Sequence, residues 1–231
     1  TPIPVNAYDM NIDMVPDGNA KTQWGPLLPG VVWTRQSAWN WDTNDYRAYT
    51  DTQNYEYYAA GAYASCPSPA RKLAPISSAE LDTYVDALQS AGNTYHDIGM
   101  IWGARLLSPT GIFKAENAGT NTSRHLIFMT DGETDTAIED YDAYGISGID
   151  RRRSADLFSL PTKILGDLEV SLRFSALCQE VKNKNMTVWV IAFGTSLTPM
   201  LTACSTPGKA FQAANATELN TAFAAIATDI A

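Results

Sequence analysis

Cysteine and histidine are both scarce in this sequence. Three cysteines among 231 residues are too few for a scaffold built on disulfides, and Cys66, Cys178 and Cys204 are too scattered for a zinc site of the Cys-x-x-Cys type. Two of these cysteines can still pair, or all three can remain thiols. His96 and His125 lie far apart in the chain, and we expect neither of them to bind a metal.

Long apolar runs are absent as well. No run approaches the roughly 20 residues that span a bilayer, and no signal peptide opens the chain. We therefore expect this segment to make no membrane contact. Because the chain begins at Thr1 and not at Met, we also expect it to be a processed or truncated piece of a longer protein, with any membrane anchor upstream.

Basic residues are outnumbered by acidic ones. The chain has 16 Lys and Arg against 25 Asp and Glu, which gives a formal net charge of −9. Phosphate groups bind to clustered Lys and Arg, so this balance argues against nucleic acid and against anionic membrane surfaces as partners. The one basic cluster, residues 151–153, is short, and we interpret it as part of a solvated loop.

The two parts of the chain differ in character. Residues 1–75 hold four of the six tryptophans and most of the prolines, and they show no helical periodicity. We interpret this part as an aromatic- and loop-rich insertion with short strands, packed on a sheet. Residues 76–231 are regular in pattern. The total length suits one α/β domain.

Helices and strands alternate in the second part. Ser77 is followed three residues later by Glu80, the spacing of a capping box, and Gly92 is a typical stop signal. Residues 126–129 have no polar residue between them, which predicts a strand buried on both faces. The pattern predicts helices over residues 77–93, 96–109, 167–185 and 217–231 and strands over residues 125–130 and 186–194, with a short strand before the last helix.

This alternation is typical of a doubly wound, mostly parallel sheet with helices on both faces. Thr217 is the expected N-cap of the last helix. The core-facing positions expected from the helical period are Val170, Phe174, Leu177 and Val181 in the third helix and Leu219, Phe223, Ile226 and Ile230 in the last.

An acidic turn follows the strand at residues 125–130, where parallel sheets bind their ligands. Asp131 lies there, and Thr94 lies in the loop before the second helix. A carboxylate and a hydroxyl are hard ligands suited to Mg²⁺. The alternatives are that Thr94 is a helix N-cap and that Asp131 only forms a turn. We interpret Glu133 and Asp135 as residues that solvate the loop.

The common catalytic patterns are missing. An EF-hand needs Gly at its sixth position, where a count from Asp131 reaches Thr136. There is no Gly-x-Ser-x-Gly elbow, no P-loop and no His-Glu-x-x-His. We therefore expect that the protein is not an enzyme. A hydrolase that uses paired carboxylates is the remaining catalytic alternative, because sequence spacing cannot place two carboxylates in one cleft.

The Thr loop followed by a strand that ends in Thr-Asp-Gly resembles two loops of the metal-ion-dependent adhesion site in von Willebrand factor A domains. Residues 77–231 resemble the C-terminal half of TadG-type proteins of the Tad (Flp) pilus-assembly system, and "CPSPARKLAPIS" fits the segment before them. The resemblance rests on four stretches in the same order: "GNTYHDIGMIWGARLLSPTGIF", "HLIFMTDGET", "LCQEVKNKNMTVWVIAFGT" and "LTACSTPGKAFQAANATELNTAFAAIATDIA".

The resemblance implies a von Willebrand factor A-like (Rossmann-like) domain in a bacterial cell-envelope protein. Such a protein is periplasmic or surface-exposed, is anchored in the inner membrane through an upstream helix, and binds protein partners among pilus or envelope components. The family pattern carries cysteines at the positions of Cys178 and Cys204, which implies a disulfide in an oxidising compartment, with two free thiols as the alternative. Cys66 would then pair upstream.

The chain departs from the family pattern in one respect. The first metal loop, Asp-x-Ser-x-Ser at the end of the central strand, is absent, so that only Thr94 and Asp131 match metal-site positions. We expect Mg²⁺ binding only if a longer parent supplies that loop and strand. Two hypotheses follow: a metal-dependent binding module, or a structural scaffold with a degenerate site. Without the central strand, the open sheet edge predicts an unstable or aggregation-prone segment.

Overall fold

The structure is a computed structural model. It describes residues 3, 7–23, 31–33, 38–40, 45–47, 55–57, 68–89, 92–119, 122–136, 141–142, 145–146 and 163–230. Cys66, the basic cluster at residues 151–153 and much of the predicted insertion lie outside these residues.

The described residues include very short strands that form antiparallel pairs. They are β1 (Val31–Trp33) with β4 (Tyr55–Tyr57), β2 (Ala38–Asn40) with β3 (Asp45–Arg47), and β6 (Tyr141–Asp142) with β7 (Gly145–Ile146).

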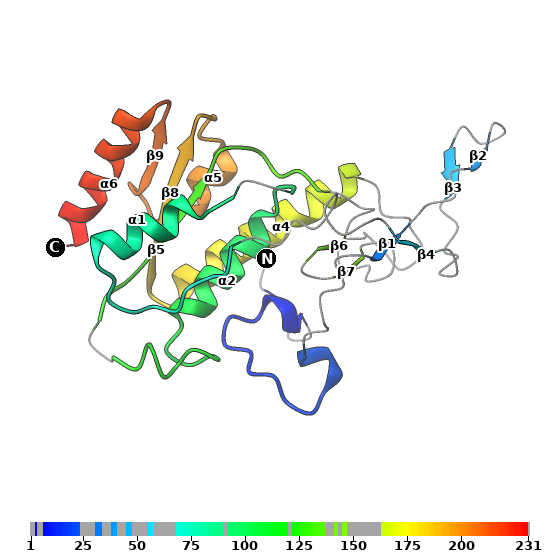
Figure 1. Ribbon diagram of the computed structural model, residues 1–231, viewed down its shortest axis with the longest axis horizontal. Helices are drawn as coiled ribbons and strands as arrows, with labels where there is room; N and C mark the ends of the chain where they lie inside the picture. The colour runs from blue at the N-terminus through cyan, green and yellow to red at the C-terminus, as the bar shows by residue number, and fades with distance from the viewer. Residues whose placement is uncertain are drawn as a thin grey trace.

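A parallel sheet of three strands forms the centre of the fold (Figure 1). Its strands, in spatial order, are β5 (Arg124–Thr130), β8 (Met186–Phe193) and β9 (Ala210–Ala213). Both pairings are parallel. Parallel neighbours need crossover connections, and helices supply them here, which makes the fold mixed α/β as predicted.

Helices cover both faces of this sheet. On one face, α2 (His96–Leu107) and α4 (Lys163–Asn183) pack on each other and on β5 and β8. The short α5 (Pro199–Cys204) lies beside them, and α6 (Ala216–Ile230) covers β8 and β9 from the other face. The four core positions expected in α4 are all fully buried, namely Val170, Phe174, Leu177 and Val181.

The first strand differs from its prediction. In β5, Leu126 and Phe128 are buried, whereas Ile127 is 41% and Met129 is 51% exposed. The prediction of burial on both faces is therefore wrong. Among the described helices, α2 and α4 cover one side of β5, so the alternation of a strand separates the covered side chains from the exposed ones. The next strand, β8, is buried along nearly its whole length.

Helix ends also differ from their predictions. α1 (Ser78–Asp86) begins with the predicted capping box between Ser77 and Glu80. It ends well before Gly92 because none of its residues is buried, and tertiary packing supplies most helical stability. α2 begins after Tyr95, which excludes Thr94 as its N-cap.

The last helix has a different cap and a narrower buried stripe than predicted. Asn215, and not Thr217, accepts the N–H of Glu218 at 3.1 Å. Asn is an equally good cap and also has an acidic residue three positions later. Ala222 and Ile226 are buried. Phe223 and Ile230 are exposed because the side of α6 that packs on β8 and β9 is the narrow stripe of Ala222 and Ile226, while Leu219 is partly buried.

An N-terminal segment packs against α2 and is held there by hydrogen bonds. Met10, the last residue of a short 3-10 helix, η1 (Tyr8–Met10), is buried in the core beside α2, and so is Ile12. The buried guanidinium of Arg105 donates to the backbone carbonyls of Asp9 at 3.0 Å and Asn11 at 3.1 Å. A second 3-10 helix, η2 (Ala20–Thr22), follows. This packing joins residues that are far apart in the chain, so periodicity in the sequence gives no sign of it.

A disulfide joins Cys178 in α4 to Cys204 at the end of α5. Both cysteines belong to the buried core, so the bridge fastens α5 to α4 from inside. None of the helices that the structure describes has the length and apolar character of a membrane span.

Candidate functional site

Two loops meet at the carboxyl end of β5. The N–H of Thr94 donates to the carbonyl of Asp135 at 2.9 Å, and the N–H of Asp135 donates to the carbonyl of Thr94 at 3.0 Å. These reciprocal bonds hold the loop before α2 against the acidic loop after β5. The side chains of Asp131, Glu133 and Asp135 are exposed there, and Thr94 is half-buried.

A buried histidine supports this loop from beneath. His96 is 3% exposed and lies against the ring of Phe128 at 5.5 Å and that of Phe174 at 5.3 Å between centroids. Its two ring nitrogens reach the hydroxyls of Thr130 and Thr134, each at 3.1 Å. Burial lowers the pKa of His96, so the imidazole is neutral near pH 7.

Hydrogen bonds link the two ring nitrogens of His96 to hydroxyls on either side. Thr130 Oγ1 donates to the carbonyl of Gly132 at 2.9 Å and lies 3.1 Å from Nε2 of His96. Nδ1 of His96 lies 3.1 Å from the hydroxyl of Thr134, whose oxygen accepts from Ser171 at 3.4 Å. This chain of bonds leads from α4 to the turn after β5.

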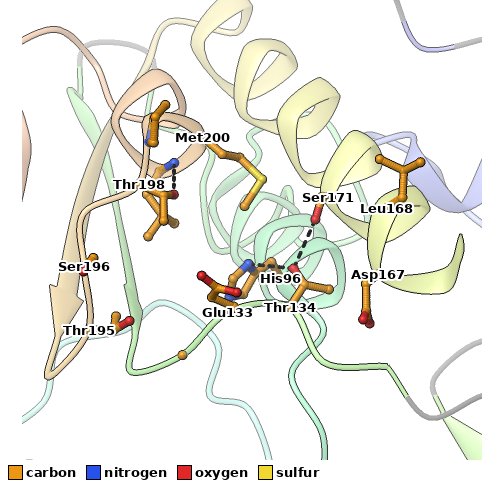
Figure 2. Close-up of a pocket in the computed structure, with 13 residues that line it drawn as sticks. His96, Glu133, Thr134, Asp167, Leu168, Ser171, Thr195, Ser196, Thr198 and Met200 are labelled. Atoms are coloured by element: carbon orange, nitrogen blue, oxygen red, sulfur yellow. Dashed lines mark hydrogen bonds between the residues drawn. The ribbon is translucent and has the colours of Figure 1, made fainter. Parts of the chain in front are cut away.

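A cavity of about 540 Å³ opens beside His96, between the loop after β5, the first turns of α4 and the loop between β8 and α5. Its volume is in the range of sites for small ligands. Figure 2 shows the Ser171, Thr134 and His96 side chains in line along its wall. The lining residues are His96, Gly132, Glu133, Thr134, Asp167, Leu168, Ser171, Thr195, Ser196, Thr198, Pro199, Met200 and Leu201.

The cavity combines negative charge with hydroxyl groups. Asp167 accepts from the N–H of Thr136 at 2.7 Å and from its hydroxyl at 2.8 Å, which fixes this carboxylate at the start of α4. Glu133 is exposed at the rim. No Lys or Arg is among the described residues that line the cavity. The charged side chains among the described lining residues are therefore both acidic.

The predicted metal residues lie beside this cavity and not in its lining. Thr94 and Asp131 come from the two paired loops, but neither of them lines the cavity. Among the described residues there is no group of three or more His, Cys, Asp or Glu placed to hold a metal ion. Mg²⁺ requires six oxygen ligands, so these two residues alone do not form a complete site.

Sequence patterns pointed to Asp131 but not to the cavity. They gave neither His96 nor His125 a metal role, and His125 accepts from the indole N–H of Trp189 at 3.1 Å. The signal for the cavity is weak, because Asp167 and Ser171 lie in a helix that looks ordinary by its period. No known protein family, no curated protein and no solved structure matches the chain significantly.

Proposed function

We propose that this chain is a non-enzymatic protein-binding domain whose binding surface is the carboxyl edge of its parallel sheet. The observation that carries this proposal is the reciprocal backbone pairing of Thr94 with Asp135. It brings the two motif-bearing loops together where α/β sheets bind their ligands. In this proposal the chain is the C-terminal part of a von Willebrand factor A-like domain from a Tad (Flp) pilus-assembly protein.

An unfilled groove along β5 supports the proposal that the sheet continues beyond this strand. It has a volume of about 390 Å³ and lies between α1, α2 and β5, with Leu81 of α1 and Ile127 of β5 among its lining residues. Val85 and Leu88, in and just after α1, are also about half exposed. Parallel strands are normally buried on both faces. A central strand from outside the described residues would fill this space and would carry the first metal loop.

The metal-dependent form of this proposal gives Thr94 and Asp131 a shared role. They would hold Mg²⁺ together with ligands from the upstream loop, and the ion would supply an open coordination position for a partner's carboxylate. A disulfide between Cys178 and Cys204 is consistent with an oxidising compartment, such as the bacterial periplasm or cell surface. The expected partners are pilus or envelope proteins.

A structural scaffold is the second candidate. No group of three or more His, Cys, Asp or Glu among the described residues is placed to hold a metal ion, and the groove beside β5 offers apolar surface for assembly. In that case the acidic loop serves as a turn. The domain would then act through its surfaces alone.

Isothermal calorimetry with Mg²⁺ and Mn²⁺ tests the metal-dependent form, on the 231-residue chain and on its longest natural form. Binding to the longest form that Asp131→Ala abolishes would support it. The matched control is Asp82→Ala, which removes an exposed carboxylate from α1. If neither form binds either ion, the metal-dependent proposal is wrong and the scaffold is favoured.

A further inference from the structure

The acidic turn after β5, residues 131–135, has an outward and an inward side. Its exposed side chains are the carboxylates at alternate positions, namely Asp131, Glu133 and Asp135. Like charges at this spacing repel one another, so they do not hold the turn in one shape. The hydroxyls of Thr130 and Thr134 are bonded to His96 instead. The shape of the turn therefore depends on its inward side.

His96 bridges two points of the chain on either side of Asp131. Its Nε2 lies 3.1 Å from the hydroxyl of Thr130, the last residue of β5, and its Nδ1 lies 3.1 Å from the hydroxyl of Thr134. The two nitrogens lie on different sides of the imidazole ring, so one side chain bonds with two hydroxyls that are four residues apart. The bridge therefore fixes the span of the chain between these two threonines.

The bridging imidazole is itself held by the core. His96 is the first residue of α2, and only 3% of it is exposed. Its ring lies against Phe128 of β5 and Phe174 of α4. Ser171 of α4 donates to the hydroxyl of Thr134, and Figure 2 shows this bond in line with the one to His96. Because two helices and a strand surround the ring, its position is set by close packing before any partner binds.

The loop that carries His96 makes a second link to the acidic turn. Two residues before His96, the backbone of Thr94 exchanges hydrogen bonds with the backbone of Asp135. The loop before α2 thus contacts the chain on both sides of the exposed Asp131 and Glu133. A binding loop that already has its bound shape loses less conformational entropy when a partner arrives. Loss of the imidazole bridge would leave the backbone pair as the remaining link between the two loops and should loosen it.

We propose that His96 is a positioning residue of the binding edge and that it holds the acidic turn in a preformed shape through Thr130 and Thr134. The turn then keeps its carboxylates outward in the free protein, and a partner meets an edge that is already formed. This inference rests on the proposed protein-binding function and adds how the binding surface is held. The alternative is that His96 only fills the core, in which case another aromatic ring would serve equally well.

Hydrogen exchange of backbone amides tests the bridge in the ¹⁵N-labelled 231-residue chain, in EDTA and without any ligand. The variant is His96→Phe, which keeps an aromatic ring in the core but removes both bonds to the threonines. We expect the amides of Thr94 and Asp135 to exchange at least about tenfold faster relative to the amide of Val190, because two hydrogen bonds of ordinary strength are lost. Val190 lies in β8 and donates to the carbonyl of Lys209, so it reports on the core. An unchanged ratio, or an equal rise at all three amides, would overturn the proposal.

A second variant tests the same link from the other side. Thr134→Val has the shape of threonine without its hydroxyl, and it should accelerate the same two amides by about threefold or more relative to the core. If His96→Phe does not fold, this variant decides the question, and an unchanged ratio in it would refute the proposal.

The matched control is His125→Phe. It removes the other histidine, which accepts from Trp189 at the beginning of β5, and should leave the ratio as it is in the wild type. A change as large as that in His96→Phe would mean that loss of either histidine has this effect, and would also overturn the proposal. Because EDTA removes metal ions, the result does not depend on the Mg²⁺ experiment. A turn that stays protected without the bridge would refute this inference and leave the proposed function standing.

Discussion

The guanidinium of Arg173 on α4 donates to the carboxylate of Asp97 on α2 at 2.8 Å, and Asp97 is fully buried. Arg173 also pairs with Asp9 in η1. One side chain thus joins two core helices and the N-terminal segment. A buried ion pair is weak evidence for net stability, but removal of one partner leaves an uncompensated charge in the core.

Replacement of Arg173 by Leu should therefore destabilise the fold strongly. We expect the free energy of unfolding to fall by roughly 3 to 5 kcal/mol, because Asp97 would stay buried without its partner. Urea denaturation followed by circular dichroism measures the change. The matched control is Lys72→Ala, which breaks an exposed pair with Glu116 and should change the stability far less. Similar losses in both variants would contradict the role assigned to burial.

Mild acid should destabilise the protein through His96. Burial lowers the pKa of its imidazole in the folded state, so the unfolded chain binds the proton more readily. Stability is then fully present above the unfolded pKa of about 6.5 and declines as the pH falls below it. The backbone of Gly132 and the neighbouring Asp97 act in the opposite direction, but burial is the larger effect.

This dependence can be separated from the titration of carboxylates. Burial acts to raise the pKa of Asp13, but hydrogen bonds from Lys184, Ser108 and Thr110 together lower that pKa below its unfolded value of about 3.8. Asp13 therefore stabilises the fold above that value and loses this effect only in stronger acid. Unfolding free energies between pH 7 and pH 5 should fall in the wild type and stay nearly flat in His96→Asn. A wild-type stability that rises toward pH 5 would refute the prediction.

Opening the disulfide should weaken the C-terminal half of the fold. Cys178 and Cys204 are 26 residues apart, and a loop of that size gives roughly 3 to 4 kcal/mol in the chain-entropy account. We expect a loss of that order in the unfolding free energy of Cys178→Ser combined with Cys204→Ser. Reduction in a Cys66→Ala background should reproduce it, and an effect of reduction that requires Cys66 would contradict the assignment.

The open side of β5 should make the chain associate with itself. Ile127 and Met129 are exposed on this strand, and Ile127 lines the groove under α1. Ile127→Lys should lower light scattering at high protein concentration, because a charged side chain on an edge strand opposes strand pairing. The matched control is Val15→Lys, which changes an exposed apolar residue in the loop between η1 and η2 and should leave the scattering as it is. A wild-type chain that stays monomeric at millimolar concentration would rule out the effect.

Local structure could be predicted from the sequence alone. Apolar runs and helical periods predicted β5, β8, α2, α4 and α6 to within a few residues, and the Ser77 capping box placed the start of α1. These signals are local, because strand and helix periods depend on neighbours a few residues away. The acidic turn at Asp131 was found for the same reason: it directly follows a recognisable strand.

Tertiary packing decided which faces of the strands and helices are covered and which side chains contact each other. Ile127 has the pattern of a core residue but is 41% exposed, because it lines a groove between α1 and β5 that the described residues do not fill. His96 has the pattern of an isolated polar residue but is buried, because Thr130 and Thr134 bind both of its nitrogens. Such outcomes depend on contacts between residues that are far apart in the chain, and no period in the sequence records them.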